Sequence, residues 1–146
     1  MISCDTNVLF AACDAENPGH QSARDFLQNH AEDGTFVVCE QVLMELYCLI
    51  RNPVVSRPPL SAGEAAAVIA VWRSNPAWRI VDVPGEARIM DRAWGLAAQR
   101  GFAFRRIFDV RLALTLHHHG VTEFATRNTR DFAEFGFTKV WDPLAP

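Results

Sequence analysis

The chain begins with Met1-Ile2-Ser3-Cys4-Asp5-Thr6-Asn7-Val8-Leu9-Phe10, and this stretch decides how the fold starts. Residues 2–4 predict a very short strand, and an apolar helix is expected to begin at Thr6. Asp5 therefore lies at the turn between the two elements. One carboxylate there says little by itself, because aspartate is a preferred N-cap residue that stabilises a helix by about 1 kcal/mol.

Two further acids stand in equally apolar surroundings. Glu45 is the only charged side chain in residues 42–50, and Asp109 follows Ile107-Phe108. Capping cannot explain a mid-helix glutamate, and a buried carboxylate needs a partner. We therefore expect Glu45 to be buried, either beside an arginine such as Arg88 or Arg92 or within a functional site. No capping box supports Asp109, although a simple cap stays open.

Composition sets the class of protein. A chain of 146 residues with 49% hydrophobic positions suits a single domain, 1–146. The formal charge of −3 argues against binding nucleic acid through global charge. No apolar run approaches the roughly 18 residues of a membrane span, so we expect a cytoplasmic protein. The cysteines are expected to be reduced core residues: Cys4, Cys13, Cys39 and Cys48.

Strand and helix patterns alternate along the chain. Such alternation implies βαβ crossovers, and hence an α/β fold in which a mostly parallel sheet is covered on both faces, a three-layer α/β/α sandwich. Ligands of such sheets gather at the carboxyl ends of the strands, so Asp5 and the turn at 126–128 should share one site. Strands are predicted at 2–4, 35–39, 79–83, 123–126 and 138–141, and helices from Thr6, at 21–30, 41–51, from Ser61, at 85–99 and at 106–119.

The three acids would repel one another if they met. Oxygen ligands in an open cleft suit Mg²⁺, with Mn²⁺ as a second possibility, and such an ion would relieve the repulsion. It could also lower the pKa of a water and offset charge on a phosphodiester. The acidic residues therefore indicate metal-assisted hydrolysis.

These residues resemble the PIN domain of VapC-type toxins of bacterial toxin–antitoxin pairs. The resemblance covers nearly the whole chain. Its motifs are Asp5-Thr6-Asn7-Val8-Leu9, the helix that carries Glu45, Phe108-Asp109 with Leu112 and Ala113 following, and Thr126-Arg127-Asn128-Thr129-Arg130-Asp131-Phe132.

The resemblance implies a PIN-like fold and a Mg²⁺-dependent endoribonuclease that acts on tRNA, rRNA or mRNA. It also implies a homodimer that binds a cognate antitoxin protein. Residues 65–72, in the helix from Ser61, are small and apolar. One face of this helix would pack on the core, and another would bind a second copy or an antitoxin peptide.

The resemblance also assigns roles to individual residues. Asp5, Glu45 and Asp109 would hold the metal directly or through water, while Thr6, Asn7 and Thr126 would orient carboxylates or water. Many relatives carry a fourth acid just after the threonine of the strand-end turn. Here Asn128 occupies the nearest position and Asp131 lies three residues further on, and we favour Asp131 as the acid.

Four arginines lie next to these motifs. Arg105 and Arg106 precede Asp109, and Arg127 and Arg130 flank Asn128. Guanidinium groups in these positions would bind RNA phosphates. The alternative is ordinary solvated charge, which carries no function.

Other functions fit parts of the pattern. A phosphatase with an N-terminal aspartate nucleophile needs a second acid two residues later, and Asn7 stands there instead. A non-catalytic α/β binding module would use the three acids only as caps and ion-pair partners. A PIN nuclease that is not a toxin would share every catalytic residue.

Overall fold

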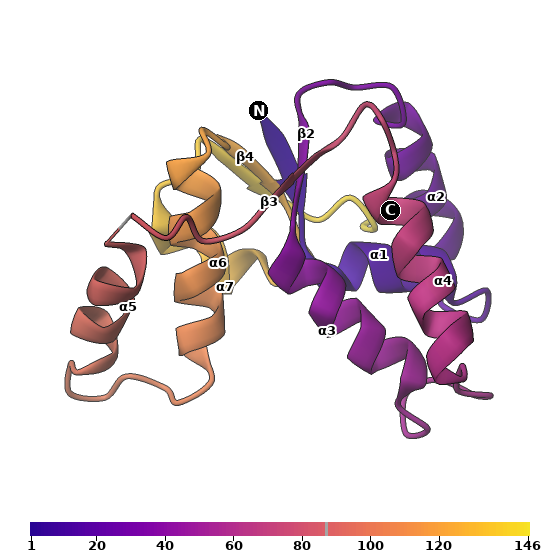
Figure 1. Ribbon diagram of the computed structural model, residues 1–146, viewed down its shortest axis with the longest axis horizontal. Helices are drawn as coiled ribbons and strands as arrows, with labels where there is room; N and C mark the ends of the chain where they lie inside the picture. The colour runs from indigo at the N-terminus through magenta and orange to yellow at the C-terminus, as the bar shows by residue number, and fades with distance from the viewer. Residues whose placement is uncertain (87) are drawn as a thin grey trace.

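A five-stranded parallel sheet forms the centre of this computed structural model, which describes residues 1–86 and 88–146 (Figure 1). Ile2 aligns with Phe36 on one side and with Glu123 on the other, so β1 is the central strand. Each of the four strand pairings is parallel, where the sequence predicted a mostly parallel sheet. The spatial order is β3 (Arg79–Val81), β2 (Phe36–Cys39), β1 (Ile2–Cys4), β4 (Glu123–Ala125) and β5 (Lys139–Trp141).

Helices cover the sheet in two groups, seen on opposite sides of the strands in Figure 1. Helices α1 to α4 pack against one another in one group, and α5 to α7 do so in the other. The predicted three-layer α/β/α sandwich is thereby confirmed. The first group comprises α1 (Thr6–Cys13), α2 (His20–Asn29), α3 (Glu40–Arg51) and α4 (Ala62–Arg73), and the second α5 (Ile89–Ala97), α6 (Arg106–His118) and α7 (Thr129–Phe132), after which a 3-10 helix spans Ala133–Phe135.

The buried core lies along the three inner strands β2, β1 and β4. Phe36 and Phe124 are fully buried, as are Cys4 and Cys39. The four cysteines are free thiols, as predicted. The prediction that all four lie in the core is wrong for Cys13 and Cys48, which are exposed because each lines an open pocket.

Most element boundaries follow the local signals. Ser61 caps α4 in a complete capping box with Glu64, and Gly120 has a φ of 82° just after α6. The strand predicted at 79–83 stops at Val81. The helix predicted at 85–99 is shorter, since α5 begins at Ile89, and Ala87 lies outside the described residues.

Helix α4 packs against α3 and buries few of its own residues. Ala65 is buried and Trp72 stacks on the buried Trp78, with ring centroids 5.8 Å apart. Val71 is 70% exposed, so part of the apolar face of α4 is uncovered, as the sequence predicted. In the described part of the chain, none of the helices has the length and apolar character needed to span a bilayer.

Candidate active site

Asp5 lies at the carboxyl end of β1 and caps α1. Its Oδ1 accepts a hydrogen bond of 2.8 Å from the backbone N–H of Thr6. Its Oδ2 accepts bonds of 2.9 Å from the Asn7 side chain and 2.6 Å from the Thr126 hydroxyl. Burial raises the pKa of Asp5, and these hydrogen bonds oppose the rise. Asp5 therefore caps α1 and also belongs to the candidate site.

A second set of bonds joins the end of β1 to the turn after β4. The Asn7 side chain donates to the Thr126 hydroxyl at 3.2 Å and accepts from the backbone N–H of Arg127 at 3.2 Å. The backbone N–H of Asn128 also donates to the Thr126 hydroxyl, at 3.0 Å. The two strand ends predicted to share a site are thus held together by side chains of both motifs.

Glu45 reaches the same region from α3. Its Oε2 accepts a bond of 2.9 Å from the Thr6 hydroxyl, and its Oε1 accepts one of 3.0 Å from the Gln41 side chain. The alternative of an arginine partner is not found, because neither Arg88 nor Arg92 makes an ion pair with Glu45 in the described chain. Its carboxylate is held by neutral donors instead.

The expected burial of Glu45 is found only in part, since the side chain is half-buried. The apolar run around it suggested a helix enclosed on all sides. One side of α3 instead faces a pocket, where Met44 is 56% exposed and Cys48 is exposed as well. Apolar residues beside an open pocket give the same sequence pattern as residues in a core.

Asp109 lies in the first turn of α6, where its side chain makes no capping bond. It is half-buried, and its pKa rises to about 6. Burial is the largest cause, followed by the negative charges of Asp5, Asp131 and Glu45, while Arg106 opposes them. The raised pKa is a sign that the predicted acids lie within electrostatic reach of one another.

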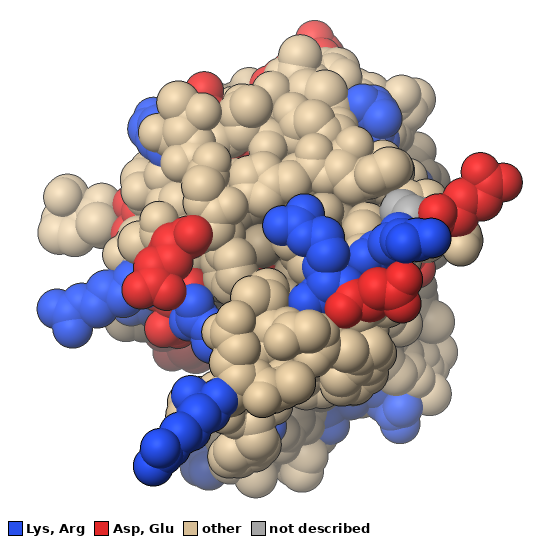
Figure 2. Space-filling view, turned by 90° about the vertical axis from the view of Figure 1, so that its left-hand side faces the viewer, with Lys and Arg blue, Asp and Glu red and all other residues tan. Residues whose placement is uncertain are grey.

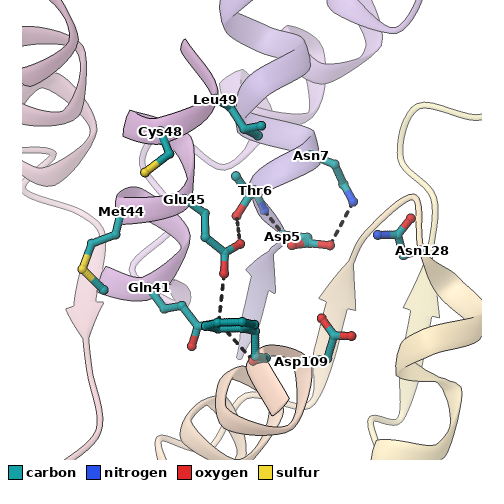
Figure 3. Close-up of a pocket in the computed structure, with 11 residues that line it drawn as sticks. Asp5, Thr6, Asn7, Gln41, Met44, Glu45, Cys48, Leu49, Asp109 and Asn128 are labelled. Carbon is teal, nitrogen blue, oxygen red and sulfur yellow. Dashed lines mark hydrogen bonds between the residues drawn. The ribbon is translucent and has the colours of Figure 1, made fainter. Parts of the chain in front are cut away.

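Asp5, Glu45 and Asp109 open onto one pocket of about 530 Å³ at the carboxyl edge of the sheet. Figure 3 shows them reaching into it from β1, α3 and α6, with Asn128 at the opposite wall. The remaining wall is largely apolar. It is made by Met44, Cys48, Leu49 and Phe108, together with Thr6, Asn7 and Gln41.

The donor set of this pocket suits a hard divalent cation. Its oxygen donors are carboxylates, and none of the three acids has a cationic partner in an ion pair within residues 1–86 and 88–146. No three acidic, histidine or cysteine side chains of those residues are grouped tightly enough to ligate one ion directly. Mg²⁺ usually keeps several waters and binds through one or two carboxylates, which fits this spacing.

Two residues were candidates for the fourth acidic position, and the structure places them differently. Asn128 lines the pocket, whereas Asp131 is exposed on α7. The charge of Asp131 nevertheless raises the pKa of Asp109, and its effect ranks above that of Glu45. Asn128 is therefore placed for contact, and Asp131 for an electrostatic effect on the same site.

Among the described residues that line the pocket, none is one of the four predicted arginines, and these arginines differ in their partners. Arg106 is half-buried and forms an ion pair of 3.2 Å with Glu134. Arg105, Arg127 and Arg130 are exposed, and none has an ion-pair partner among the residues described. Figure 2 shows the side of the molecule that carries α5 to α7, where basic and acidic groups are interspersed.

Two polar residues of the site were not singled out from the sequence. Gln41 is buried and donates to the carbonyl of Phe108 at 3.0 Å, and Arg111 donates to the Gln41 side-chain oxygen at 2.7 Å. These contacts span 67 and 70 positions of sequence. Neither residue differs in type from its neighbours enough to give a local signal.

The family model of the PIN domain matches residues 2–138, which is most of the chain. The chain belongs to the PIN domain family. The predicted resemblance is thereby confirmed, and the pocket at the carboxyl edge lies inside the matched PIN region.

A curated relative places this PIN domain among the VapC proteins. Ribonuclease VapC24 of Mycobacterium tuberculosis, from strains CDC 1551 and H37Rv, is 49% identical over 144 residues. The aligned region covers 99% of this chain and 97% of the relative.

Solved structures support the fold of this PIN domain. VapC20 of Mycobacterium tuberculosis, a Sarcin-Ricin loop cleaving toxin, superimposes with a TM-score of 0.70 at 20% identity, covering 94% of this chain and 97% of its own. FitAB bound to a DNA fragment gives a TM-score of 0.62 at 18% identity, covering 100% and 97%. At these identities the likeness concerns the fold.

Proposed function

We propose that this PIN domain is a Mg²⁺-dependent endoribonuclease that hydrolyses RNA phosphodiester bonds. The observation that carries the proposal is the shared pocket. Asp5, Glu45 and Asp109 line it from three elements without an ion-pair partner in the described chain, and the pKa of Asp109 is raised to about 6 by burial and by neighbouring charge. The name of the 49% identical relative, Ribonuclease VapC24, supports the same activity.

The residues of the pocket have different roles in this proposal. Asp5, Asp109 and Glu45 would hold Mg²⁺, or Mn²⁺ in its place, directly or through water. When bound, the ion supplies Lewis acidity that lowers the pKa of a water and offsets charge on the phosphodiester. Thr6 orients Glu45, and Thr126 orients Asp5.

The remaining predicted residues belong to the edge of the site. Asn7 orients Asp5, and Asn128 contacts the pocket, while Asp131 adds negative charge that favours a bound cation. The RNA backbone contacts are four arginines with free or weakly paired guanidinium groups. They are Arg105, Arg106, Arg127 and Arg130.

The biological role in this proposal is that of a toxin in a toxin–antitoxin pair, located in the cytoplasm. The support is the VapC24 relative and the toxin activity of VapC20. A cognate antitoxin protein and a second copy of the chain are the proposed partners, and α4 offers apolar surface at Val71. Cleavage of tRNA, rRNA or mRNA is compatible with the pocket.

The experiment is cleavage of total tRNA and ribosomal RNA by the purified, antitoxin-free protein, with Mg²⁺ or with EDTA. Asp109→Asn is the test variant. Asp91→Asn is its matched control, because Asp91 also lies in the first turn of a helix but not at the pocket. We expect cleavage with Mg²⁺ by wild type and Asp91→Asn, and none with EDTA or by Asp109→Asn. Folded wild-type protein that cleaves no RNA at any Mg²⁺ concentration would favour the binding-module alternative.

A further inference from the structure

The polar chain behind Glu45 begins at the end of β3 and crosses two helices. Asp82 accepts a bond of 2.9 Å from one terminal nitrogen of Arg111, on α6. The other terminal nitrogen of Arg111 donates to the side-chain oxygen of Gln41, on α3, at 2.7 Å. The side-chain nitrogen of Gln41 then donates to Glu45. The pocket carboxylate is therefore connected to a guanidinium group through one amide.

Arg111 fixes the orientation of that amide. A guanidinium group has only donors, so it must face the oxygen of Gln41 and not its nitrogen. The two N–H bonds of Gln41 then point at two acceptors, Glu45 Oε1 and the carbonyl of Phe108, each at 3.0 Å. Rotating the amide by 180° would place its oxygen against both acceptors and its N–H groups against the arginine. Only one orientation satisfies every partner.

The same amide sets the spacing of two acids of the site. Gln41 is 4% exposed and lies four residues before Glu45 on α3. Its other bond ends on Phe108, the residue directly before Asp109 on α6. A shift of α3 against α6 would break one of the two bonds. Gln41 therefore couples the position of Glu45 to that of Asp109.

We propose that Gln41 and Arg111 are a pair of positioning residues, which hold Glu45 and Asp109 in the arrangement that binds the catalytic cation. The inference rests on the proposed nuclease function. It assigns neither residue a contact with RNA, because Gln41 is buried and both terminal nitrogens of Arg111 are engaged within the protein. Removing a hydrogen-bonding partner of this kind behind a metal ligand typically lowers metal affinity or activity by about 10- to 100-fold.

The test compares Gln41→Met and Arg111→Met with matched controls. Gln21→Met removes a similar bond between a glutamine and an acid four residues later, to Asp25 on α2, and Arg73→Met removes the exposed ion pair with Glu40. Three quantities are measured: the affinity for Mn²⁺ without RNA, by titration calorimetry, and kcat and KM for RNA cleavage. Thermal unfolding identifies any variant that fails to fold.

We expect both test variants to bind Mn²⁺ about 10-fold or more weakly and to lose kcat, with KM for RNA unchanged. The two controls should match wild type. Should Arg111→Met fail to fold, Arg111→Lys replaces it: it keeps the positive charge but has one terminal nitrogen in place of the two that bond Gln41 and Asp82, and it should show the same losses, smaller in size. Wild-type Mn²⁺ affinity and kcat in the folded variants would overturn the inference, as would a rise in KM alone, which would make Arg111 an RNA contact.

Failure of wild type to cleave RNA would instead overturn the proposed function, and this inference with it.

Discussion

The hydroxyl of Thr126 donates a 2.6 Å hydrogen bond to the carboxylate of Asp5, across 121 positions of sequence. The bond joins the carboxyl ends of β4 and β1, and both partners are buried. A buried carboxylate that loses such a donor is left with an uncompensated desolvation cost. This contact therefore serves the fold and the pocket together.

Removing that donor should destabilise the protein. Thr126→Val keeps the shape of the side chain but not the hydroxyl, and we expect it to lower the free energy of unfolding by about 1 to 3 kcal/mol at pH 7. Thr126→Ser, which retains the hydroxyl, should lose much less. Urea unfolding of the metal-free protein measures both, and equal stability of Thr126→Val and wild type would contradict the expectation.

Asp109 should make the metal-free protein less stable as the pH rises. Its pKa is raised from 3.8 to about 6, so the native state binds more protons than the unfolded chain between these values. The loss of folding stability that Asp109 causes is absent well below pH 3.8 and complete above about pH 6. Asp109→Asn should therefore be more stable than wild type at pH 7 by about 1 kcal/mol, a value reduced for solvent screening of a half-exposed group.

The measurement for Asp109 is chemical unfolding at pH 3.5 and pH 7.5 in EDTA, with Asp91→Asn as control. Asp109→Asn should have a higher free energy of unfolding than wild type only at pH 7.5. A loss of stability at pH 7.5 would mean that Asp109 is a structural charge with a native partner, as the binding-module alternative requires.

Divalent cations should stabilise the fold in the absence of RNA. An ion that binds only the native state adds about 2.7 kcal/mol at a concentration 100 times its Kd. We expect Mg²⁺ and Mn²⁺ to raise the Tm of wild type and to have little effect on Asp109→Asn. Thermal unfolding with increasing cation checks this, and an equal rise in both proteins would place the cation elsewhere.

The exposed arginines should act on RNA affinity and not on the chemical step. Arg127→Gln and Arg130→Gln are expected to raise KM. If each guanidinium group neutralises one phosphate, each substitution should reduce the salt dependence of binding to single-stranded RNA by about 0.7 in slope. Arg24→Gln, on the opposite helical layer at α2, is the control. Unchanged KM and slope in both test variants would mean that Arg127 and Arg130 are ordinary surface charges that do not bind RNA.

The sequence predicted the site residues that differ in polarity from their immediate neighbours. Asp5 stands out because a carboxylate interrupts an apolar strand-to-helix junction, and Glu45 and Asp109 stand out because each is an acid within an apolar stretch. The parallel sheet follows from the alternation of short apolar runs with helical patterns. Contrast of this kind is visible in a few neighbouring residues.

What escaped prediction depends on distant partners or on exposure. Gln41 and Arg111 meet across 70 positions, and neither looks unusual in its own helix. Cys48 was expected in the core, because an apolar residue beside a pocket has the same neighbours in sequence as one inside the protein. Helix α7, of four residues, is too short for a periodic pattern to be recognised.

The most direct test of the central claim is a double-mutant cycle on RNA cleavage with Mg²⁺, using Asp5→Asn, Asp109→Asn and the double variant. If the acids form one catalytic site, each single variant should lose about 100-fold or more in kcat, and the double variant should lose little beyond that. Losses that simply multiply would mean that the two acids act independently. A single variant with wild-type kcat would remove that acid from the site.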